Sequence, residues 1–378
     1  MLKIGVIGMG GRMAGLTRLL AERHGHDVAI TAFSSDFPEY SLAALSRQGV
    51  TAAQMRHFAD PTQMLAQEDL DGIMIGTRCD AHTDMAILSL PTGLPIFLEK
   101  PVAINVDQLQ RLAAAGMASA SPVLVSFPLR VSPLATMAKK IVDSGEIGTV
   151  NHVQAMNNVP YGRGYFHKWY RNDQTTGGLF LQKATHDLDC INYLVGCQPV
   201  QIAAMDAKQI FKGDKPAGLK CADCPELAVC PENDYYQQFP ESLCCFAEDT
   251  GNQDSGSILI RYATGMHAAY SQNFFVRKAA GQRMIRLMGY EGTLEFDWYT
   301  NQVKVCSHTR DWVSTHTYDT KAGHFGGDDV LMANFVQMMR GQAAPLATLG
   351  DGLVSARMCV AAEQSARTDR FCDLATIN

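Results

Sequence analysis

The sequence predicts an α/β protein that begins with a doubly wound parallel sheet and continues into an α+β domain with a large, mostly antiparallel open sheet. Over about the first 125 residues, short apolar runs alternate with amphipathic helical patterns, which is typical of a parallel sheet. After Phe127 the chain carries a series of alternating strand patterns with few helices between them. We therefore expect domains at 1–126 and 127–378, with a Cys-rich insertion at about 213–246.

The composition is that of an ordinary globular protein, with 47% hydrophobic and 19% charged residues. The 378 residues exceed one typical core, which favours two domains. A net charge of −6 argues against nucleic-acid binding and offers no basic patch for a membrane surface. No apolar run approaches the ~20 residues of a membrane span, and the start of the chain is too Gly-interrupted for a signal peptide. Since eleven cysteines accompany no secretory signal, we expect a cytoplasmic protein with reduced thiols.

The first element is an apolar strand at 3–7 that runs directly into a glycine turn and a helical pattern. The turn consists of Gly8, Met9, Gly10, Gly11, Arg12 and Met13. Strand, glycine turn and helix form the context in which a dinucleotide pyrophosphate binds at a helix N-terminus. Met13 stands at the third glycine position, so the match to the fingerprint is incomplete.

The second strand, at 28–33, ends in Ser34, Ser35 and Asp36. An acidic residue at this end binds the adenosine ribose of NAD. Ser34 occupies that register, and Asp36 follows two residues later, where it could equally be a turn residue. A serine leaves room for a 2′-phosphate, and Arg12 is the nearby cation, so NAD and NADP both stay open.

The other elements follow from the same periodicities. In the first domain we expect helices at 40–48, 82–90 and 106–117 and strands at 71–75, 95–98 and 122–127. In the second we expect helices at 133–144, 179–194, 328–339 and 352–368, and strands at 150–159, 200–207, 257–262, 266–275, 284–288, 293–296 and 302–305.

The strand at 95–98 leads into Glu99, Lys100 and Pro101. The carboxyl end of a parallel strand is where α/β sheets place their ligands, so Lys100 is a candidate for contact with cofactor and substrate. The alternative is a solvated lysine beside a turn.

Taken together, these motifs resemble the glucose–fructose oxidoreductase / inositol dehydrogenase / rhizopine catabolism (Gfo/Idh/MocA) family from end to end. The matching stretches are Gly8–Met13, Thr77 to His82, Glu99–Pro101, Arg130–Pro133, Ser144–Gly148, Gly177-Gly178 leading to His186–Asp189, His324–Asp328 and Asp351–Leu353. The resemblance implies a Rossmann domain that binds NAD or NADP and a C-terminal domain whose sheet builds homodimers or homotetramers. It also implies oxidation or reduction of a sugar, cyclitol or related polyol.

The resemblance maps the catalytic lysine and histidine of the family to Lys100 and His186. We expect His186 to exchange the hydroxyl proton, because imidazole titrates near working pH. Lys100 would then hydrogen-bond the reacting oxygen. Thr77, His82 and Glu99 join the glycine turn as expected cofactor contacts. The alternative for His186 is a helix histidine satisfied by a neighbour.

Relatives commonly carry an acidic residue four positions before the histidine, where this chain has Gln182 followed by Lys183. Glutamine cannot take a proton, so the proton relay differs. Lys183, His186 and Asp189 are spaced along one helical face, and we expect Lys183 to bind substrate oxygens while Asp189 orients His186. A structural ion pair between Lys183 and Asp189 is the alternative.

The stretch from 161 to 171 is dense in aromatic and basic groups, which sugar-binding sites use. The expected substrate contacts there are Tyr161, Arg163 and Trp169, although a surface loop with buried aromatics has the same composition. Arg130 and His324 are further candidates on the strength of the resemblance.

The spacing Cys-x2-Cys-x5-Cys, with a later cysteine pair, predicts a structural zinc site. Its ligands would be Cys221, Cys224, Cys230 and Cys244. An iron–sulfur centre and free thiols are the alternatives.

The sequence therefore favours an NAD(P)-dependent oxidoreductase for a small sugar-like substrate. One rival is a glycoside-cleaving enzyme that oxidises its substrate transiently and recycles its NAD. The other is a regulator that senses dinucleotide without catalysis.

Overall fold

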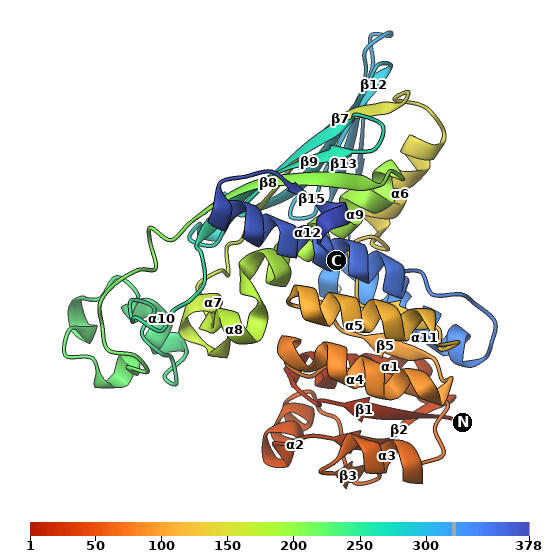
Figure 1. Ribbon diagram of the computed structural model, residues 1–378, viewed down its shortest axis with the longest axis vertical. Helices are drawn as coiled ribbons and strands as arrows, with labels where there is room; N and C mark the ends of the chain where they lie inside the picture. The colour runs from red at the N-terminus through yellow and green to blue at the C-terminus, as the bar shows by residue number, and fades with distance from the viewer. Residues whose placement is uncertain (320–322, 378) are drawn as a thin grey trace. The chain divides into compact units, whose positions relative to one another are not determined.

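The computed structural model describes residues 1–319 and 323–377, which form two compact units (Figure 1). The first comprises residues 1–136 and 323–357, and the second comprises 137–319 and 358–377. By contacts, then, 323–357 belong with the N-terminal unit, although the sequence-based division had placed them in the second domain. Among the described residues, no helix combines the length and apolar character that a membrane crossing requires.

The first unit contains a six-stranded parallel sheet of order β3-β2-β1-β4-β5-β6. Its strands are β1 (Leu2–Ile7), β2 (Val28–Ser34), β3 (Arg56–Phe58), β4 (Gly72–Ile75), β5 (Ile96–Leu98) and β6 (Val123–Val125). The connecting helices are α1 (Gly11–His24), α2 (Pro38–Arg47), α3 (Pro61–Gln67), α4 (His82–Ser89) and α5 (Val106–Met117). This order reverses direction between β1 and β4, and ligands of such sheets bind at the carboxyl ends beside that point.

Local sequence explains most of these elements. β4 is buried at all four positions because helices cover both faces of a parallel sheet. Asn105 caps α5 by accepting a hydrogen bond from the Gln108 amide, and Asp60 caps α3 in the same way through Thr62. α11 (Gly327–Met339) packs against α1 within this unit, while α12 (Leu349–Thr368) begins in the first unit and ends in the second.

The second unit is built on a nine-stranded sheet of order β14-β13-β12-β11-β7-β10-β9-β8-β15, antiparallel except between β7 and β10. The strands are β7 (Val150–Asn158), β8 (Pro199–Ala207), β9 (Ser255–Tyr262), β10 (His267–Asn273), β11 (Gln282–Gly289), β12 (Gly292–Asp297), β13 (Gln302–Ser307), β14 (Val313–Thr317) and β15 (Cys372–Asp373). Its helices are α7 (Gly164–His167), α8 (Asp173–Thr176), α9 (Thr185–Val195) and the short α10 (Asn233–Gln238) of the insertion, while α6 (Pro133–Asp143) crosses the boundary between units. The predicted fold class is confirmed.

Candidate active site

The glycine turn between β1 and α1 leaves its backbone accessible. Gly8 has a φ of +84°, and a Cβ there would lie 2.5 Å from the Thr77 nitrogen, so only glycine fits. A Cβ on Gly10 or Gly11 would meet nothing within 4 Å, and no side chain caps α1 at Gly10. These open amide groups at a helix N-terminus suit a pyrophosphate, so the residues present fit a dinucleotide.

Met13, at the position of the missing third glycine, has a compensating partner. That glycine ordinarily permits close packing of helix against strand. Here Met13 is fully buried, and a Cβ on Gly76 would lie 2.5 Å from its terminal methyl carbon. The space needed at this contact is provided by Gly76 at the end of β4 instead of by the helix.

Arg12 is held by two buried carboxylates of its own unit. Its Nη1 and Nη2 atoms donate to the two oxygens of Asp328 at 2.6 and 2.7 Å, and Nε donates to Glu99 at 2.9 Å. The Ser126 hydroxyl also donates to Glu99, at 2.9 Å. Nδ1 of His324 lies 2.8 Å from Asp328. The structure thus joins three of the predicted site residues, Arg12, Glu99 and His324, in one charge cluster through Asp328, which the sequence reasoning had not singled out.

The carboxyl end of β2 carries no buried acidic side chain. Ser34 is buried, and its carbonyl accepts a hydrogen bond from the Gly8 amide at 2.9 Å. The Ser35 hydroxyl accepts from the Phe37 amide and from the Ser41 hydroxyl, which fixes the turn. Asp36 is exposed in this turn. Of the three predicted cofactor contacts after β2, which are Ser34, Ser35 and Asp36, only Asp36 carries a carboxylate.

His82 links the ends of two neighbouring strands. It is buried, with Nδ1 2.8 Å from the Pro101 carbonyl oxygen and Nε2 3.1 Å from the Thr77 carbonyl oxygen. Burial lowers its pKa, so the ring is neutral at physiological pH. His82 thereby positions the segment after β4 against Glu-Lys-Pro, and Lys100 lies two residues after the end of β5.

Arg130 lies in an ion pair within its unit. Its Nη1 is 3.1 Å from Asp351 and donates to the Leu346 carbonyl at 3.3 Å, and its side chain is 5% exposed. These contacts tie Arg130 to the start of α12. The sequence analysis assigns Arg130 to substrate binding, and these contacts within the protein are additional to that expectation.

In the second unit, the polar residues of the predicted catalytic helix are buried at its beginning. Phe180–Ala184 form a π-helical turn that leads into α9. Gln182, Lys183, His186 and Asp189 are all less than a tenth exposed. Such π-turns are frequent at functional sites, because they re-aim side chains within a helix.

The ammonium of Lys183 lies among phenol groups. Its Nζ donates to the Tyr161 hydroxyl at 3.0 Å and lies 4.7 and 5.0 Å from the ring centroids of Tyr161 and Tyr165. Burial alone would raise the pKa of Tyr161, but the positive charges of Lys183 and Arg283 outweigh it and lower the pKa to about 8. Burial likewise opposes the charge on Lys183, yet the neighbouring phenols raise its pKa above the usual value. Tyr161 and Lys183, both predicted from sequence, are brought together.

Asp187 anchors this helix to the sheet and was not a predicted residue. It accepts from Arg283 Nε at 2.7 Å, from Tyr270 at 2.9 Å and from Asn157 at 3.0 Å. Both members of the Asp187–Arg283 pair are buried. The signal in the sequence was the charged residue directly after His186, inside an apolar helix.

Arg163 and Trp169, the other predicted substrate contacts, differ in their surroundings. Arg163 donates to Asp234 at 2.7 Å, a residue of the Cys-rich insertion. Trp169 stacks on Tyr170 with ring centroids 3.9 Å apart.

The four cysteines predicted to bind zinc do not form a metal site. In the described part of the chain, no group of three or more Cys, His, Asp or Glu side chains is arranged to hold an ion. Burial raises the pKa of the Cys221 thiol to about 11, and the nearby Cys244, Cys230 and Cys224 add to this effect. The thiols are neighbours, but their placement does not fit a zinc ion, so this prediction is not supported.

A parallel sheet of this order, with an open glycine turn after its first strand, defines a dinucleotide-binding α/β protein. Residues 2–127 match the NAD-binding Rossmann fold of the Gfo/Idh/MocA oxidoreductases, and residues 139–374 match the C-terminal alpha/beta domain of the same family. The chain belongs to the Gfo/Idh/MocA oxidoreductase family. The predicted family is thereby confirmed.

Individual relatives are distant. A Bacillus subtilis chain described as an oxidoreductase, YteT, is 22% identical over 83% of each sequence. Inositol 2-dehydrogenase of Rhizobium meliloti is 26% identical over 51% of this chain, and the match spans only 55% of that enzyme. Among solved structures, a levoglucosan dehydrogenase in complex with NADH and levoglucosan superimposes with a TM-score of 0.79 at 17% identity, over 99% of each chain. The structural likeness establishes the fold.

Proposed function

We propose that the protein is an NAD(P)-dependent dehydrogenase that moves a hydride between the nicotinamide and a secondary alcohol or ketone of a sugar, cyclitol or related polyol. The observation that carries this proposal is the buried polar start of α9. A charged lysine is costly to bury. Here Lys183 is buried three residues before the buried His186, and its ammonium donates a hydrogen bond to the Tyr161 hydroxyl. Inositol 2-dehydrogenases and levoglucosan dehydrogenase among the relatives support a polyol substrate.

When bound, the dinucleotide supplies the hydride acceptor. His186 takes the proton of the reacting hydroxyl. Lys100, two residues after the end of β5, is the candidate of the first unit for contact with cofactor and substrate. The positive charge of Lys183 stabilises negative charge on substrate oxygens, and Tyr161 fixes the position of that ammonium. Gln182 offers no carboxylate to the histidine, so a cationic side chain replaces the acidic group common in relatives.

Of the two dinucleotides, we assign NAD as the preferred one. A 2′-phosphate needs a cation with unsatisfied donors. The guanidinium of Arg12 already donates to Asp328 and Glu99. Exposed Asp36 can accept hydrogen bonds from ribose hydroxyls and would repel a phosphate.

The test begins with the dinucleotide released by denaturing the purified protein, followed by titration with NAD and NADP and a turnover assay over a panel of sugars and cyclitols. We expect NAD to bind more tightly and cofactor reduction with at least one polyol. His186→Asn should lower kcat by about 10²–10⁴-fold, as loss of a general base does, with dinucleotide affinity unchanged. Tightly bound dinucleotide with glycoside cleavage and no net NADH would indicate the recycling enzyme instead. Binding without any turnover would indicate a regulator.

A second copy of the chain is the partner we assign to the open face of the nine-stranded sheet. Ala203, Leu259, Ala269, Gln154, Arg286 and Glu295 are consecutive cross-strand partners and share one face. On β9 this face alternates with buried positions, and Leu259 is 53% exposed. Light scattering should give a dimer or tetramer, and Leu259→Arg should dissociate it; a monomeric wild type would refute this assignment.

A further inference from the structure

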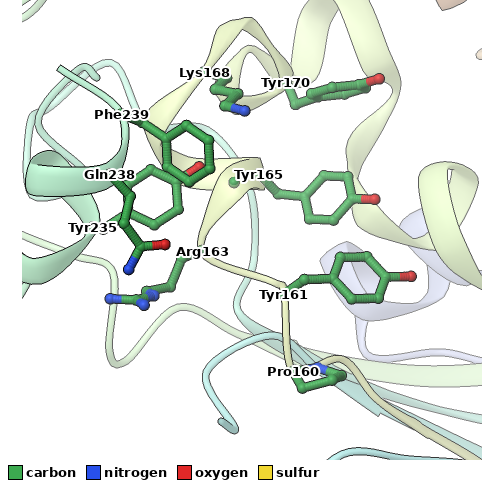
Figure 2. A pocket seen from close by; sticks show the side chains of 10 residues that line it. Pro160, Tyr161, Arg163, Tyr165, Lys168, Tyr170, Tyr235, Gln238 and Phe239 are labelled. Carbon is green, nitrogen blue, oxygen red and sulfur yellow. The ribbon is translucent and has the colours of Figure 1, made fainter. Parts of the chain in front are cut away.

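A pocket of about 480 Å³ lies in the second unit between the 160–170 segment and the Cys-rich insertion (Figure 2). Its volume falls within the ~300–1,000 Å³ of small-molecule sites. Five aromatic residues line it: Tyr161, Tyr165, Tyr170, Tyr235 and Phe239. Aromatic faces pack against the C–H groups of sugar rings, and the polar neighbours Lys168 and Gln238 can reach ring oxygens.

The pocket adjoins Lys183 through two of its own walls. Tyr161 and Tyr165 line the pocket, and the Lys183 ammonium lies beside both rings. Figure 2 shows the hydroxyl groups of these two tyrosines pointing away from Tyr235 and Phe239. Tyr161 and Tyr165 are therefore shared between the pocket and the surroundings of Lys183.

The wall supplied by the insertion is held in place by a buried carboxylate. Glu232 is 4% exposed and accepts from Arg277 at 2.5 Å, with Arg163 at 3.5 Å and His167 Nε2 at 3.4 Å. The other ring nitrogen of His167 lies 2.8 Å from the Leu243 carbonyl oxygen. Tyr235 stacks on His167 with centroids 4.4 Å apart. This wall is therefore pre-organised, which lowers the entropic cost of binding.

Two residues from the two sides of the pocket, Phe239 and Lys168, lie next to each other. Phe239, directly after α10, is 42% exposed, so part of its ring is accessible from the pocket. Lys168 Nζ lies 4.4 Å from the Phe239 ring centroid, and within residues 1–319 and 323–377 no carboxylate pairs with it. Arg163, by contrast, is already paired with Asp234. The pocket thus presents an aromatic face with an adjacent cation able to donate to hydroxyl or carboxylate oxygens.

We infer that this pocket is a subsite for a second sugar ring, so that the substrate is a glycoside or oligosaccharide of at least two rings. One ring is oxidised near Lys183 and His186, and the next stacks on Phe239 and Tyr235 with its oxygens on Lys168. This inference rests on the proposed dehydrogenase function. In this arrangement the insertion supplies the outer wall of the pocket.

The test compares single rings with matched two-ring sugars: glucose with cellobiose, and galacturonate with digalacturonate, on the full-length protein. For at least one pair, kcat/KM for the two-ring sugar should exceed that for the single ring by about tenfold, the gain of one good stacking contact. Phe239→Ala should remove that gain and change single-ring turnover by less than about twofold. Tyr236→Ala is the matched control, since it alters the same helix without lining the pocket, and it should change neither value.

Binding measured by saturation-transfer NMR with cellobiose and digalacturonate separates the two proposals. If no sugar reduces the cofactor but Phe239→Ala abolishes binding of a two-ring sugar, the dehydrogenase proposal fails and the subsite stands. If neither two-ring sugar binds better than its single ring, or if Phe239→Ala and Tyr236→Ala behave alike, the subsite inference is overturned.

Discussion

The ion pair between Arg12 and Asp328 should contribute much more to stability than an adjacent pair on the same helix. Both oxygens of Asp328 accept from Arg12, and the Asp328 side chain is 8% exposed. Asp329, the next residue, pairs with Arg23 at 3.0 Å, but the Arg23 side chain is 63% exposed and that of Asp329 is 32% exposed. Asp328→Asn and Asp329→Asn therefore make the same chemical change in the first turn of α11, with the same effect on the helix dipole.

The expected magnitude follows from burial. Removing one partner of a buried pair costs about 3–5 kcal/mol. Arg12 keeps its bond to Glu99 and is a third exposed, so we expect a cost at or below the lower limit of that range, about 2–3 kcal/mol, for Asp328→Asn. Asp329→Asn should cost at most about 0.5 kcal/mol.

The dependence on pH provides a second check. Despite burial, which acts in the opposite direction, Arg12 and His324 hold the pKa of Asp328 well below its usual 3.8. A depressed folded-state pKa means that the stabilisation is complete above the unfolded value and is lost as the pH falls through the folded one. The difference between wild type and Asp328→Asn should therefore be constant near neutrality and shrink below pH 3.8.

Hydrogen exchange of peptides from α1 and α11, measured in increasing urea, is the suitable assay. A chain with two compact units need not unfold in one step, so a single global midpoint would mix the contributions of both. If Asp328→Asn destabilises these peptides no more than Asp329→Asn does, then the cluster around Arg12 does not stabilise this unit.

Three further predictions concern the glycine turn, the Lys183 contact and a buried carboxyl group. Gly8→Ala should abolish NAD binding in calorimetry and lower the free energy of unfolding by about 1–3 kcal/mol. Gly15→Ala is the control, because a Cβ at Gly15 would meet nothing within 4 Å, and it should preserve NAD binding. Equal NAD affinities of the two variants would exclude the proposed role of the turn. Lys183→Met should raise the phenol titration of Tyr161, followed by ultraviolet absorbance, from about 8 toward its usual value, and an unshifted curve would refute the electrostatic cause. Burial raises the pKa of Glu363 to about 7, so the wild type should lose about 3 kcal/mol of stability as the pH rises from 4.5 to 7, and Glu363→Gln should remove this slope in urea titrations.

Elements with a strong apolar period could be predicted to within a residue or two. The helix Val106–Met117 has the predicted bounds because its amphipathic pattern begins directly after the Asn105 cap. β3 was missed, since Arg56–Phe58 offers one buried side chain in three residues. β14 was missed because all of its side chains are at least partly exposed, so no alternation marks the strand.

The candidate site was predictable where chemistry follows local sequence and not where it depends on distant partners. The glycine turn spans residues 8–13, and Lys183 and His186 are three residues apart, so each of these two motifs lies within a few consecutive residues. The Asp328 contact to Arg12 spans 316 positions, and the Cys-rich insertion was interpreted through its cysteines. The two residues of the insertion that line the pocket, Tyr235 and Phe239, carry no spacing signal, because the segment that forms the rest of the pocket lies about 70 positions earlier in the chain.

The replacement of an acidic residue by Gln182 and the neighbouring Lys183 has a consequence for substrate choice. A carboxylate at this position would repel acidic substrates, whereas the ammonium of Lys183 attracts them. The chain keeps that ammonium charged by placing phenols beside it, and the same phenols form the inner wall of the aromatic pocket. The charge on Lys183 and the shape of the pocket thus depend on the same side chains, Tyr161 and Tyr165. A substrate that exploits both would carry anionic or oxygen-rich groups near the reacting carbon and a further ring beyond them.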